Sequence, residues 1–239
     1  MIGVGIIGFG TVGMGTYKIL RDHRLLILQR TGIDLKVVKI ADIDLGRERP
    51  VAPEPGMLTA DAYEVIDHPD VDVVVELMGG TGLAYDFIAY AASKKKPVVT
   101  ANKALLAERG NEIYSLMRKE GCDLGFEAAV AGGIPVIRAT RQGLVANKIR
   151  HILGILNGTS NYILTKMTEE GVSFSSALGR AQELGYAEQD PTLDVEGIDA
   201  AHKLCILARM SFHCPIRMEE ITTRGISELS GVDISFAKE

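Results

Sequence analysis

Short apolar runs alternate with stretches of helical periodicity over the first half of the chain. The apolar runs are continuous and rich in β-branched residues, as in strands of a parallel sheet that is covered on both faces. Strands that alternate with helices predict an α/β fold with a doubly wound parallel sheet. The predicted strands cover residues 2–7, 35–41, 71–75, 97–100 and 122–126, and the predicted helices cover residues 11–28, 83–93 and 103–120.

The second half of the chain has a different pattern, with mostly helical periodicity. A strand is predicted over residues 150–156. Because the pattern changes between residues 131 and 147, we expect one domain over residues 1–131 and a second, α+β domain over residues 132–239. The helices predicted in this half cover residues 160–168, 173–184 and 195–211, with the start of a further helix over residues 231–239.

The composition is that of an ordinary globular protein. Hydrophobic residues make up 46% of the chain, so a sizeable core can be buried. The formal net charge of −5 argues against a nucleic-acid partner, which favours a concentrated basic surface. The one dense basic run precedes a predicted strand, and we interpret it as a solvated helix end: Lys94, Lys95 and Lys96.

The cysteines and the first residues indicate the compartment. Cys122, Cys205 and Cys214 are scattered and lack CxxC spacing, which is typical of reduced thiols. Met1 leads directly into an apolar strand without the features of a signal peptide, and no apolar stretch reaches the length of a membrane span. We therefore expect a cytoplasmic protein with no membrane partner.

A glycine motif follows the first predicted strand. Gly8, Gly10 and Gly13 form GxGxxG, in which the glycines permit a tight turn, close approach of a pyrophosphate and close packing of helix on strand. The backbone at Thr11 and Val12 opens the next helix, where N–H groups face phosphate charge. The strand–loop–helix context predicts a Rossmann-type dinucleotide-binding domain; the alternative is a glycine-rich turn that binds nothing.

An acidic residue follows the second predicted strand. Asp42 stands where a carboxylate can accept hydrogen bonds from the adenosine ribose hydroxyls and repel a 2′-phosphate. Arg47 and Arg49 follow closely and can reach such a phosphate. Asp42 therefore favours NAD over NADP without deciding the choice, and the alternative for Asp42 is a simple turn residue.

Two later strands end in polar sequence, at Glu76 and at Thr100. Ligands of such sheets bind beyond the carboxyl ends of the strands. Lys103 opens the helix that follows, where the positive end of the helix dipole disfavours a cation. We therefore expect an anionic partner for Lys103, either a substrate carboxylate or a cofactor phosphate; the alternative is a helix-start lysine with no role.

Acidic residues and one lysine are concentrated in a short stretch of the second half. Asp199 and Lys203 are four residues apart and share a face of a helix that is apolar around much of its circumference. We expect this pair to be at least partly buried, which implies a satisfied network or a reactive site. The alternatives are an exposed ion pair and, for Asp194, a helix N-cap.

Five segments, which follow one another in the family's order, resemble motifs of the homoserine dehydrogenase family, and the resemblance covers essentially the whole chain. The last segment is the most specific because it joins the acidic residues to the helix of Lys203. The segments are GFGTVG at the start, VVTANKALLA at 98–107, FEAAVAGGIP at 126–135, LNGTSNYIL at 156–164 and ELGYAEQDPTLDVEGIDAAHKLCILA at 183–208.

The resemblance implies a nucleotide domain that carries a substrate domain, usually in a homodimer. It implies an NAD(P)-dependent oxidoreductase that acts on a CH–OH group and interconverts L-homoserine and L-aspartate 4-semialdehyde, on the route to threonine and methionine. The family's catalytic region runs beyond Glu239 and often ends in a regulatory domain, so we expect this chain to be catalytically incomplete.

The resemblance also implies residue roles. Lys203 matches the catalytic acid and base; Asp199 shares its catalytic site, and Asp199 and Glu188 match substrate ligands. Asp194 belongs to the same acidic cluster, and Lys103 lies between cofactor and substrate. Further implied cofactor contacts are Thr100 and Gly185, and the implied monovalent-cation site, for sodium or potassium, comprises Glu127, Val130, Gly132 and Ile134.

Two other functions stay open from the sequence. Another Rossmann-type amino-acid dehydrogenase is possible, although aspartate-semialdehyde dehydrogenase needs a nucleophilic cysteine in a glycine- or asparagine-rich loop, and no cysteine here has that setting. The second alternative is a nucleotide-binding module without catalysis, against which the intact Asp199 and Lys203 pair argues.

Overall fold

A computed structural model describes residues 1–237 and divides the chain into two compact units. The first unit ends at Ile137 and the second begins at Arg138, within the region 131–147 where the sequence pattern changes. No helix among the described residues has both the length and the apolar character that crossing a membrane requires.

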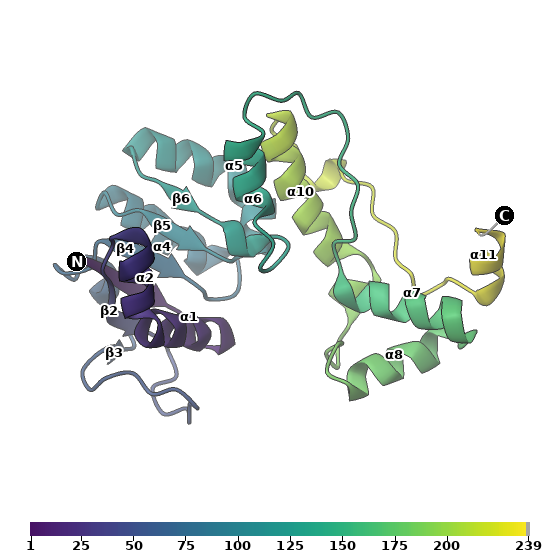
Figure 1. Ribbon diagram of the computed structural model, residues 1–239, viewed down its shortest axis with the longest axis horizontal. Helices are drawn as coiled ribbons and strands as arrows, with labels where there is room; N and C mark the ends of the chain where they lie inside the picture. The colour runs from purple at the N-terminus through teal and green to yellow at the C-terminus, as the bar shows by residue number, and fades with distance from the viewer. Residues whose placement is uncertain (238–239) are drawn as a thin grey trace. The chain divides into compact units, whose positions relative to one another are not determined.

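The first unit is built on a six-stranded sheet in which every neighbouring pair of strands is parallel (Figure 1). The strand order β3-β2-β1-β4-β5-β6 is the order of dinucleotide-binding doubly wound sheets. This confirms the predicted fold class, although the sequence pattern missed the two-residue strand β3. The strands are β1 (Ile2–Ile7), β2 (Leu35–Ala41), β3 (Leu58–Thr59), β4 (Val73–Glu76), β5 (Val98–Thr100) and β6 (Leu124–Gly125).

Helices connect the strands of this unit. The single helix predicted over residues 11–28 is wrong, because the chain forms two helices that meet at the non-helical residue His23. The short helix α3 was also missed, since six residues give too little periodicity to detect. The helices are α1 (Thr11–Asp22), α2 (Arg24–Thr31), α3 (Ala62–Asp67), α4 (Gly82–Ser93), α5 (Lys103–Glu120), the 3₁₀ turn η1 (Glu127–Ala129) and α6 (Val136–Arg138).

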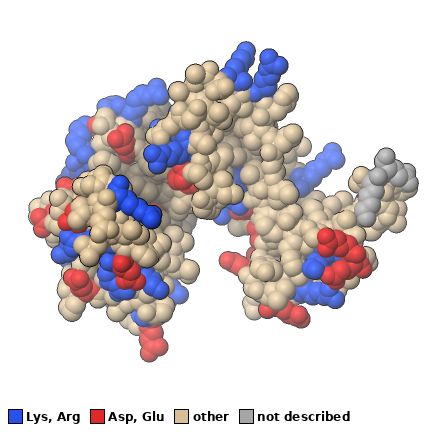
Figure 2. Space-filling view, viewed as in Figure 1, with Lys and Arg blue, Asp and Glu red and all other residues tan. Residues whose placement is uncertain are grey.

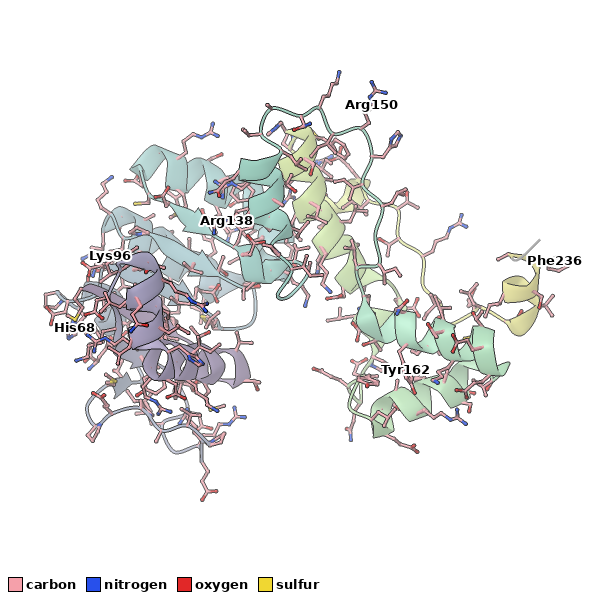
Figure 3. The ribbon with its side chains drawn as sticks, viewed as in Figure 1. His68, Lys96, Arg138, Arg150, Tyr162 and Phe236 are labelled. Atoms are coloured by element: carbon pink, nitrogen blue, oxygen red, sulfur yellow. The ribbon has the colours of Figure 1, made fainter. Side chains whose placement is uncertain are left out.

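The core of the first unit lies between the sheet and its helices. Ile6 of β1 and Phe9 of the glycine loop are fully buried, and Phe9 packs edge-on against Tyr17 of α1 with ring centroids 5.7 Å apart. At the amino end of the β4–β5 pair, Lys96 donates a hydrogen bond to the carbonyl of His68, both labelled in Figure 3. This hydrogen bond joins the segment after α3 to the segment before β5, whereas the carboxyl ends of β4 and β5 carry the polar residues Glu76 and Thr100.

The regular elements described in the second unit are all helical. Two of them, α7 and α8, lie side by side and bury Ile163, Met167 and Ala181 between them (Figure 1). Tyr162 of α7 lies 5.1 Å from the ring of Tyr186 (Figure 3). The elements are the π-helical turn η2 (Ala139–Gly143), α7 (Gly158–Glu170), α8 (Phe174–Glu183), α9 (Thr192–Val195), α10 (Ile198–Phe212), η3 (Met218–Glu220) and α11 (Gly231–Phe236).

The strand predicted over residues 150–156 is wrong. This segment has no regular secondary structure, and Leu153 and Ile155 are 96% and 78% exposed. A β-strand needs a hydrogen-bonded neighbour, and no described segment of this unit pairs with it. The helix predicted over residues 231–239 forms as far as Phe236, and its last two positions lie outside the described residues.

Candidate active site

The glycine loop joins β1 to α1 in a geometry that only glycine permits at two positions. Gly8 has φ +96°, and a Cβ there would lie 2.7 Å from the backbone of Leu77. A Cβ on Gly13 would lie 2.0 Å from the carbonyl oxygen of Gly8. A Cβ on Gly10 would meet no protein atom within 4 Å. The first and third glycines are therefore required by the fold, whereas the space at Gly10 is left open beside the start of α1.

The start of α1 is shaped for an anion. The N-cap is Gly10, no side chain caps the helix, and no acidic residue lies in its first turn. Thr11 and Val12 are exposed there. Because the first N–H groups of a helix lack intrahelical partners, this end offers backbone donors and a positive dipole to a phosphate.

Asp42 follows β2 and contacts the glycine loop. Its carboxylate accepts hydrogen bonds from the backbone N–H of Phe9 at 2.8 Å and of Asp44 at 2.9 Å. It also forms an ion pair with Arg49 at 3.3 Å. Asp42 thus holds the loop that the sequence assigned to the cofactor.

The carboxyl ends of β4 and β5 share a buried polar network. Glu76 is fully buried, and its carboxyl group accepts from the Thr100 hydroxyl at 2.6 Å and from the Met78 N–H at 2.9 Å. Burial raises the pKa of Glu76, although the hydrogen bonds from Thr100, Met78 and Asn102 oppose the rise. The side chain of Thr100 therefore points into the protein, and the sequence did not single out Glu76 for this role.

Asn102 links this network to the next loop and to α5. Its side-chain amide donates to the carbonyl of Gly80 at 2.7 Å, and its side-chain oxygen accepts from the N–H of Leu105 as the N-cap of α5. Lys103 is the first residue of that helix, as predicted from the sequence. Asn102 therefore fixes both the loop after β4 and the position of Lys103.

Lys203 and Asp199 form the central ion pair of the second unit. Nζ of Lys203 lies 2.6 Å from Oδ2 of Asp199 and also donates to the carbonyl of Leu156 at 2.7 Å. The Asp199 side chain is 7% exposed and that of Lys203 is 19% exposed. The prediction that this pair is at least partly buried is confirmed.

Asn157 joins the acidic residues of the cluster and was missed in the sequence. Its amide nitrogen donates to Asp199 at 2.9 Å and to Asp194 at 2.6 Å. Its side-chain oxygen accepts from the N–H of Ser160 and so caps α7. An asparagine three residues before a serine at a helix start was a visible N-cap signal, but nothing in the sequence showed that its amide would reach two carboxylates 37 and 42 residues away.

Asp194 has a different position from the one that its spacing suggested. It lies within α9, and the N-cap of α10 is Gly197, so Asp194 does not cap the long helix. Its carboxylate instead accepts from Asn157. Asn157 therefore links Asp194 to Asp199, which in turn binds Lys203. Among the described residues, the Glu188 side chain makes no hydrogen bond or ion pair with this cluster and lies exposed beyond α8.

An exposed ion pair of the same spacing provides a contrast. Lys166 and Glu170 are also four residues apart on a helix, with Nζ 2.6 Å from the carboxylate, and Arg180 contacts the same Glu170. Figure 2 shows basic and acidic side chains together on the surface of α7 and α8. The side chains of Lys166 and Glu170 are 29% and 37% exposed, so solvent screens this pair more than it screens Lys203 and Asp199.

The predicted cation site is a tight turn in the first unit. Ala131 and Gly132 both have a positive φ, 63° and 56°, which turns the chain sharply after η1. Glu127 accepts a hydrogen bond from the N–H of Ile137 at 2.9 Å, and the carbonyl of Ile134 accepts from Val136. Glu127 thus supports the start of α6 as well as offering carboxylate oxygen. Val130 is buried, and Gly132 and Ile134 are exposed.

Gly185 follows α8 with φ +75°, a conformation that favours glycine. A Cβ there would meet no protein atom within 4 Å. As at Gly10, the described residues leave space at this backbone position.

Family models match both parts of the chain. The homoserine dehydrogenase NAD-binding domain matches residues 8–127, and the homoserine dehydrogenase domain matches residues 135–239. The chain belongs to the homoserine dehydrogenase family. A curated homoserine dehydrogenase from Pseudomonas aeruginosa is 49% identical over 98% of this chain, and the match covers 54% of that protein. The chain thus spans about half the length of the curated relatives it matches.

Solved structures of the homoserine dehydrogenase family share the fold. A crystal structure of a homoserine dehydrogenase from Thiobacillus denitrificans has a TM-score of 0.93 and 47% identity, and the match covers 99% of this chain and 55% of that one. A hyperthermophilic archaeal homoserine dehydrogenase in complex with NADPH has a TM-score of 0.80 and 26% identity, over 96% of this chain and 75% of that one.

Proposed function

We propose that the chain is the nucleotide-binding and catalytic part of a homoserine dehydrogenase, with Lys203 as its proton-transfer group. The observation that carries the proposal is the partly buried contact of Lys203 with Asp199, at 2.6 Å, within the second domain of this family. In this reaction a hydride is transferred reversibly between a nicotinamide cofactor and C4 of the substrate, which interconverts L-homoserine and L-aspartate 4-semialdehyde.

Lys203 has the donors that this reaction needs. Its ammonium has three N–H groups, and the contacts with Asp199 and Leu156 use two of them. The third donates to the carbonyl oxygen of the semialdehyde. As the aldehyde carbon is reduced, the C=O π electrons move to oxygen, and Nζ transfers its proton to the developing alkoxide. In the opposite direction the neutral amine takes the hydroxyl proton, and Asp199 stabilises the ammonium that forms.

The acidic residues suit the amino group of an amino-acid substrate. We assign this ammonium to Asp199 and Glu188, with Asp194 holding Asn157 in place from the other side. The substrate carboxylate needs a cation, and Lys103 is the residue we assign to it. Binding an amino acid by both of its charged ends orients its reacting carbon.

The first unit fits a dinucleotide by its own geometry. The glycine loop leaves the volume beside Gly10 open and presents the uncapped start of α1, which a pyrophosphate can occupy. The archaeal relative bound to NADPH supports a nicotinamide cofactor. When bound, the cofactor supplies or accepts the hydride. Contacts are proposed for Gly8, Gly10, Thr11, Val12, Gly13, Asp42, Thr100, Lys103 and Gly185.

A monovalent cation fits the turn after η1 by donor chemistry. The carboxylate of Glu127 and the carbonyls of Val130, Gly132 and Ile134 are oxygen donors, which hard cations prefer. Two successive residues with positive φ, Ala131 and Gly132, turn the chain sharply between these donors. Exchange of sodium or potassium for tetramethylammonium tests this part, and unchanged activity and stability would count against it.

The assembly and compartment are also proposals. We propose a cytoplasmic homodimer, in keeping with three cysteines that form no disulfide among the described residues. Light scattering of the purified protein measures the oligomeric state directly.

A direct assay tests the activity. The purified full-length protein that contains this chain is mixed with L-homoserine and NAD⁺ or NADP⁺, and the absorbance of the reduced nicotinamide is followed. Turnover with homoserine and not with lactate or malate is expected. Nucleotide binding without turnover of homoserine would indicate a binding module and would contradict the proposed activity.

A further inference from the structure

The carboxylate of Asp42 is already engaged on both oxygens. Oδ2 accepts from the N–H of Phe9, and Oδ1 accepts from the N–H of Asp44 and lies 3.3 Å from Nη2 of Arg49. An ionised carboxylate has about four acceptor positions, so three of them are already used. Asp42 is therefore first a group that ties the glycine loop to the end of β2.

The guanidinium of Arg49 is buried beside Asp42. Its side chain is only 4% exposed, and Cζ lies 5.6 Å from the ring centroid of Phe9. Nη1 donates to the carbonyl of Arg47, and Nη2 donates to the carbonyl of Asp44. An arginine stays charged under all conditions that proteins tolerate, so its buried charge offsets that of Asp42.

One donor of Arg49 is left over. Among the described residues, Nε of Arg49 is the one buried side-chain nitrogen or oxygen that has no hydrogen-bond partner. Buried polar groups are almost always paired, so an unpaired guanidinium N–H at this point is a signal that a ligand acceptor completes it. The acceptor must lie near the glycine loop and the end of β2.

We propose that Arg49 neutralises Asp42 and makes the nucleotide site accept a 2′-phosphate as well as a ribose hydroxyl. This inference rests on the proposed binding of a nicotinamide dinucleotide. An acidic residue after the second strand favours NAD because it accepts from the ribose and repels the phosphate. Here the carboxylate is occupied and its charge is compensated within hydrogen-bonding distance, so the repulsion is lost. Asp42 alone predicts NAD preference; the Asp42–Arg49 pair predicts weak discrimination.

Equilibrium binding of NADH and NADPH to the purified protein, followed by nicotinamide fluorescence, tests the proposal. The two dissociation constants are expected to agree within about tenfold. Arg49→Met removes the charge and keeps the length, which uncovers Asp42, and is expected to weaken NADPH relative to NADH by about tenfold or more. Combining Asp42→Asn with Arg49→Met should return the ratio of the two dissociation constants to that of the unmodified protein, because both charges are then absent.

The ratio separates specificity from a purely structural role of Arg49. A disordered loop weakens both nucleotides equally, so an unchanged ratio in Arg49→Met would overturn the proposal, as would a preference of the unmodified protein for NADH by about a hundredfold. If Arg49→Met does not fold, two other variants test the proposal. Arg49→Lys is expected to keep the ratio of the NADPH and NADH dissociation constants, and Asp42→Asn is expected to shift this ratio in favour of NADPH. If Arg47→Met changed the ratio of the dissociation constants and Arg49→Met did not, the phosphate would be assigned to Arg47, which would also contradict the proposal. Binding of neither nucleotide would contradict the proposed function itself.

Discussion

The hydroxyl of Thr100 donates a 2.6 Å hydrogen bond to the carboxyl group of Glu76, and both side chains are fully buried. This contact joins the carboxyl ends of the neighbouring strands β4 and β5. The same carboxyl group accepts a hydrogen bond from the N–H of Met78. Asn102, two residues after Thr100, donates a hydrogen bond from its side-chain amide to the carbonyl of Gly80. The loop after β4 is thus fixed from two strands at once.

Glu76 predicts a dependence of stability on pH. Because burial raises its pKa in the folded protein above the ordinary 4.5, the folded state binds the proton more tightly than the unfolded state does. The stabilisation from the bound proton is present below the ordinary pKa and is lost as the pH rises through the folded value. Relative to Glu76→Gln, which cannot ionise, the unmodified protein should therefore be more stable at about pH 5 than at about pH 8 in urea unfolding.

Glu112 provides the control for this measurement. It is exposed, and the hydrogen bond from Arg109 lowers its pKa, so Glu112→Gln should give a small difference of the opposite sign. If the difference between the unmodified protein and Glu76→Gln were the same at both ends of the pH range, Glu76 would not be the buried ionisable group described here.

The position of Glu76 could be predicted in part. Continuous apolar runs showed where the strands are, and the carboxyl ends of parallel strands are where polar residues meet. The contact between Glu76 and Thr100 depends on the register of β4 against β5, which pairs these two residues directly. Register is set by packing on both faces of the sheet, and a single sequence of buried strands with no alternation does not reveal it.

The glycine loop separates residues needed for folding from a residue needed for the ligand. Gly10→Ala should fold with an unchanged melting temperature, since its Cβ meets no protein atom within 4 Å and its φ is −79°. It should weaken nucleotide binding by about tenfold or more, because the methyl group would lie where we propose that a pyrophosphate approaches. Calorimetric unfolding and a nucleotide titration measure the two effects separately.

Two neighbouring glycines are the controls. Gly15→Ala lies inside α1 with open space around its Cβ and should stabilise the protein by about 0.5–1 kcal/mol without affecting binding. Gly13→Ala should destabilise it by about 2 kcal/mol or more, because its Cβ would lie 2.0 Å from the carbonyl oxygen of Gly8. Normal nucleotide affinity in Gly10→Ala would argue against a pyrophosphate at this loop.

Asn157 should be important for the stability of the second unit. Asn157→Ala removes the cap of α7 and the donor to Asp194 and Asp199, and should destabilise the protein by about 2–4 kcal/mol. Asn157→Asp keeps the capping oxygen but adds a third carboxylate, so it should be less stable than Asn157→Ala at neutral pH. Its deficit should shrink as the pH falls and the carboxylates are protonated.

The exposed Asn161 on the same helix is the control, and Asn161→Ala should change the free energy of unfolding by less than about 0.5 kcal/mol. Asn157→Asp as stable as the unmodified protein across the pH range would show that Asp194 and Asp199 do not both lie near the substituted side chain.

In the second half of the chain, the sequence predicted one ion pair correctly and the structure of one segment wrongly. The pair of Asp199 and Lys203 could be found because helical spacing places both residues on one face, and the apolar surroundings indicated burial. The segment before Asn157 was misassigned as a strand because its apolar residues, including Leu153 and Ile155, satisfy the local pattern. Local pattern gives the tendency to extend, but a strand forms only where another segment accepts and donates its hydrogen bonds.

Lys203 is the residue whose substitution most directly tests proton transfer. Lys203→Ala should lower kcat by about a hundredfold or more, with little change in the dissociation constant of the nucleotide. Lys166→Ala removes a lysine of the same spacing and ion-pair distance from an exposed pair and should leave kcat unchanged.

Lys203→Arg is the decisive variant, because arginine keeps the charge next to Asp199 but does not release a proton at ordinary pH. If positive charge alone were required, Lys203→Arg would keep most of the activity, and the assignment of Lys203 as acid and base would be wrong. If proton transfer is required, Lys203→Arg should be nearly as slow as Lys203→Ala, and adding Asp199→Ala should slow either variant by much less than it slows the unmodified protein, since the two residues act as a unit.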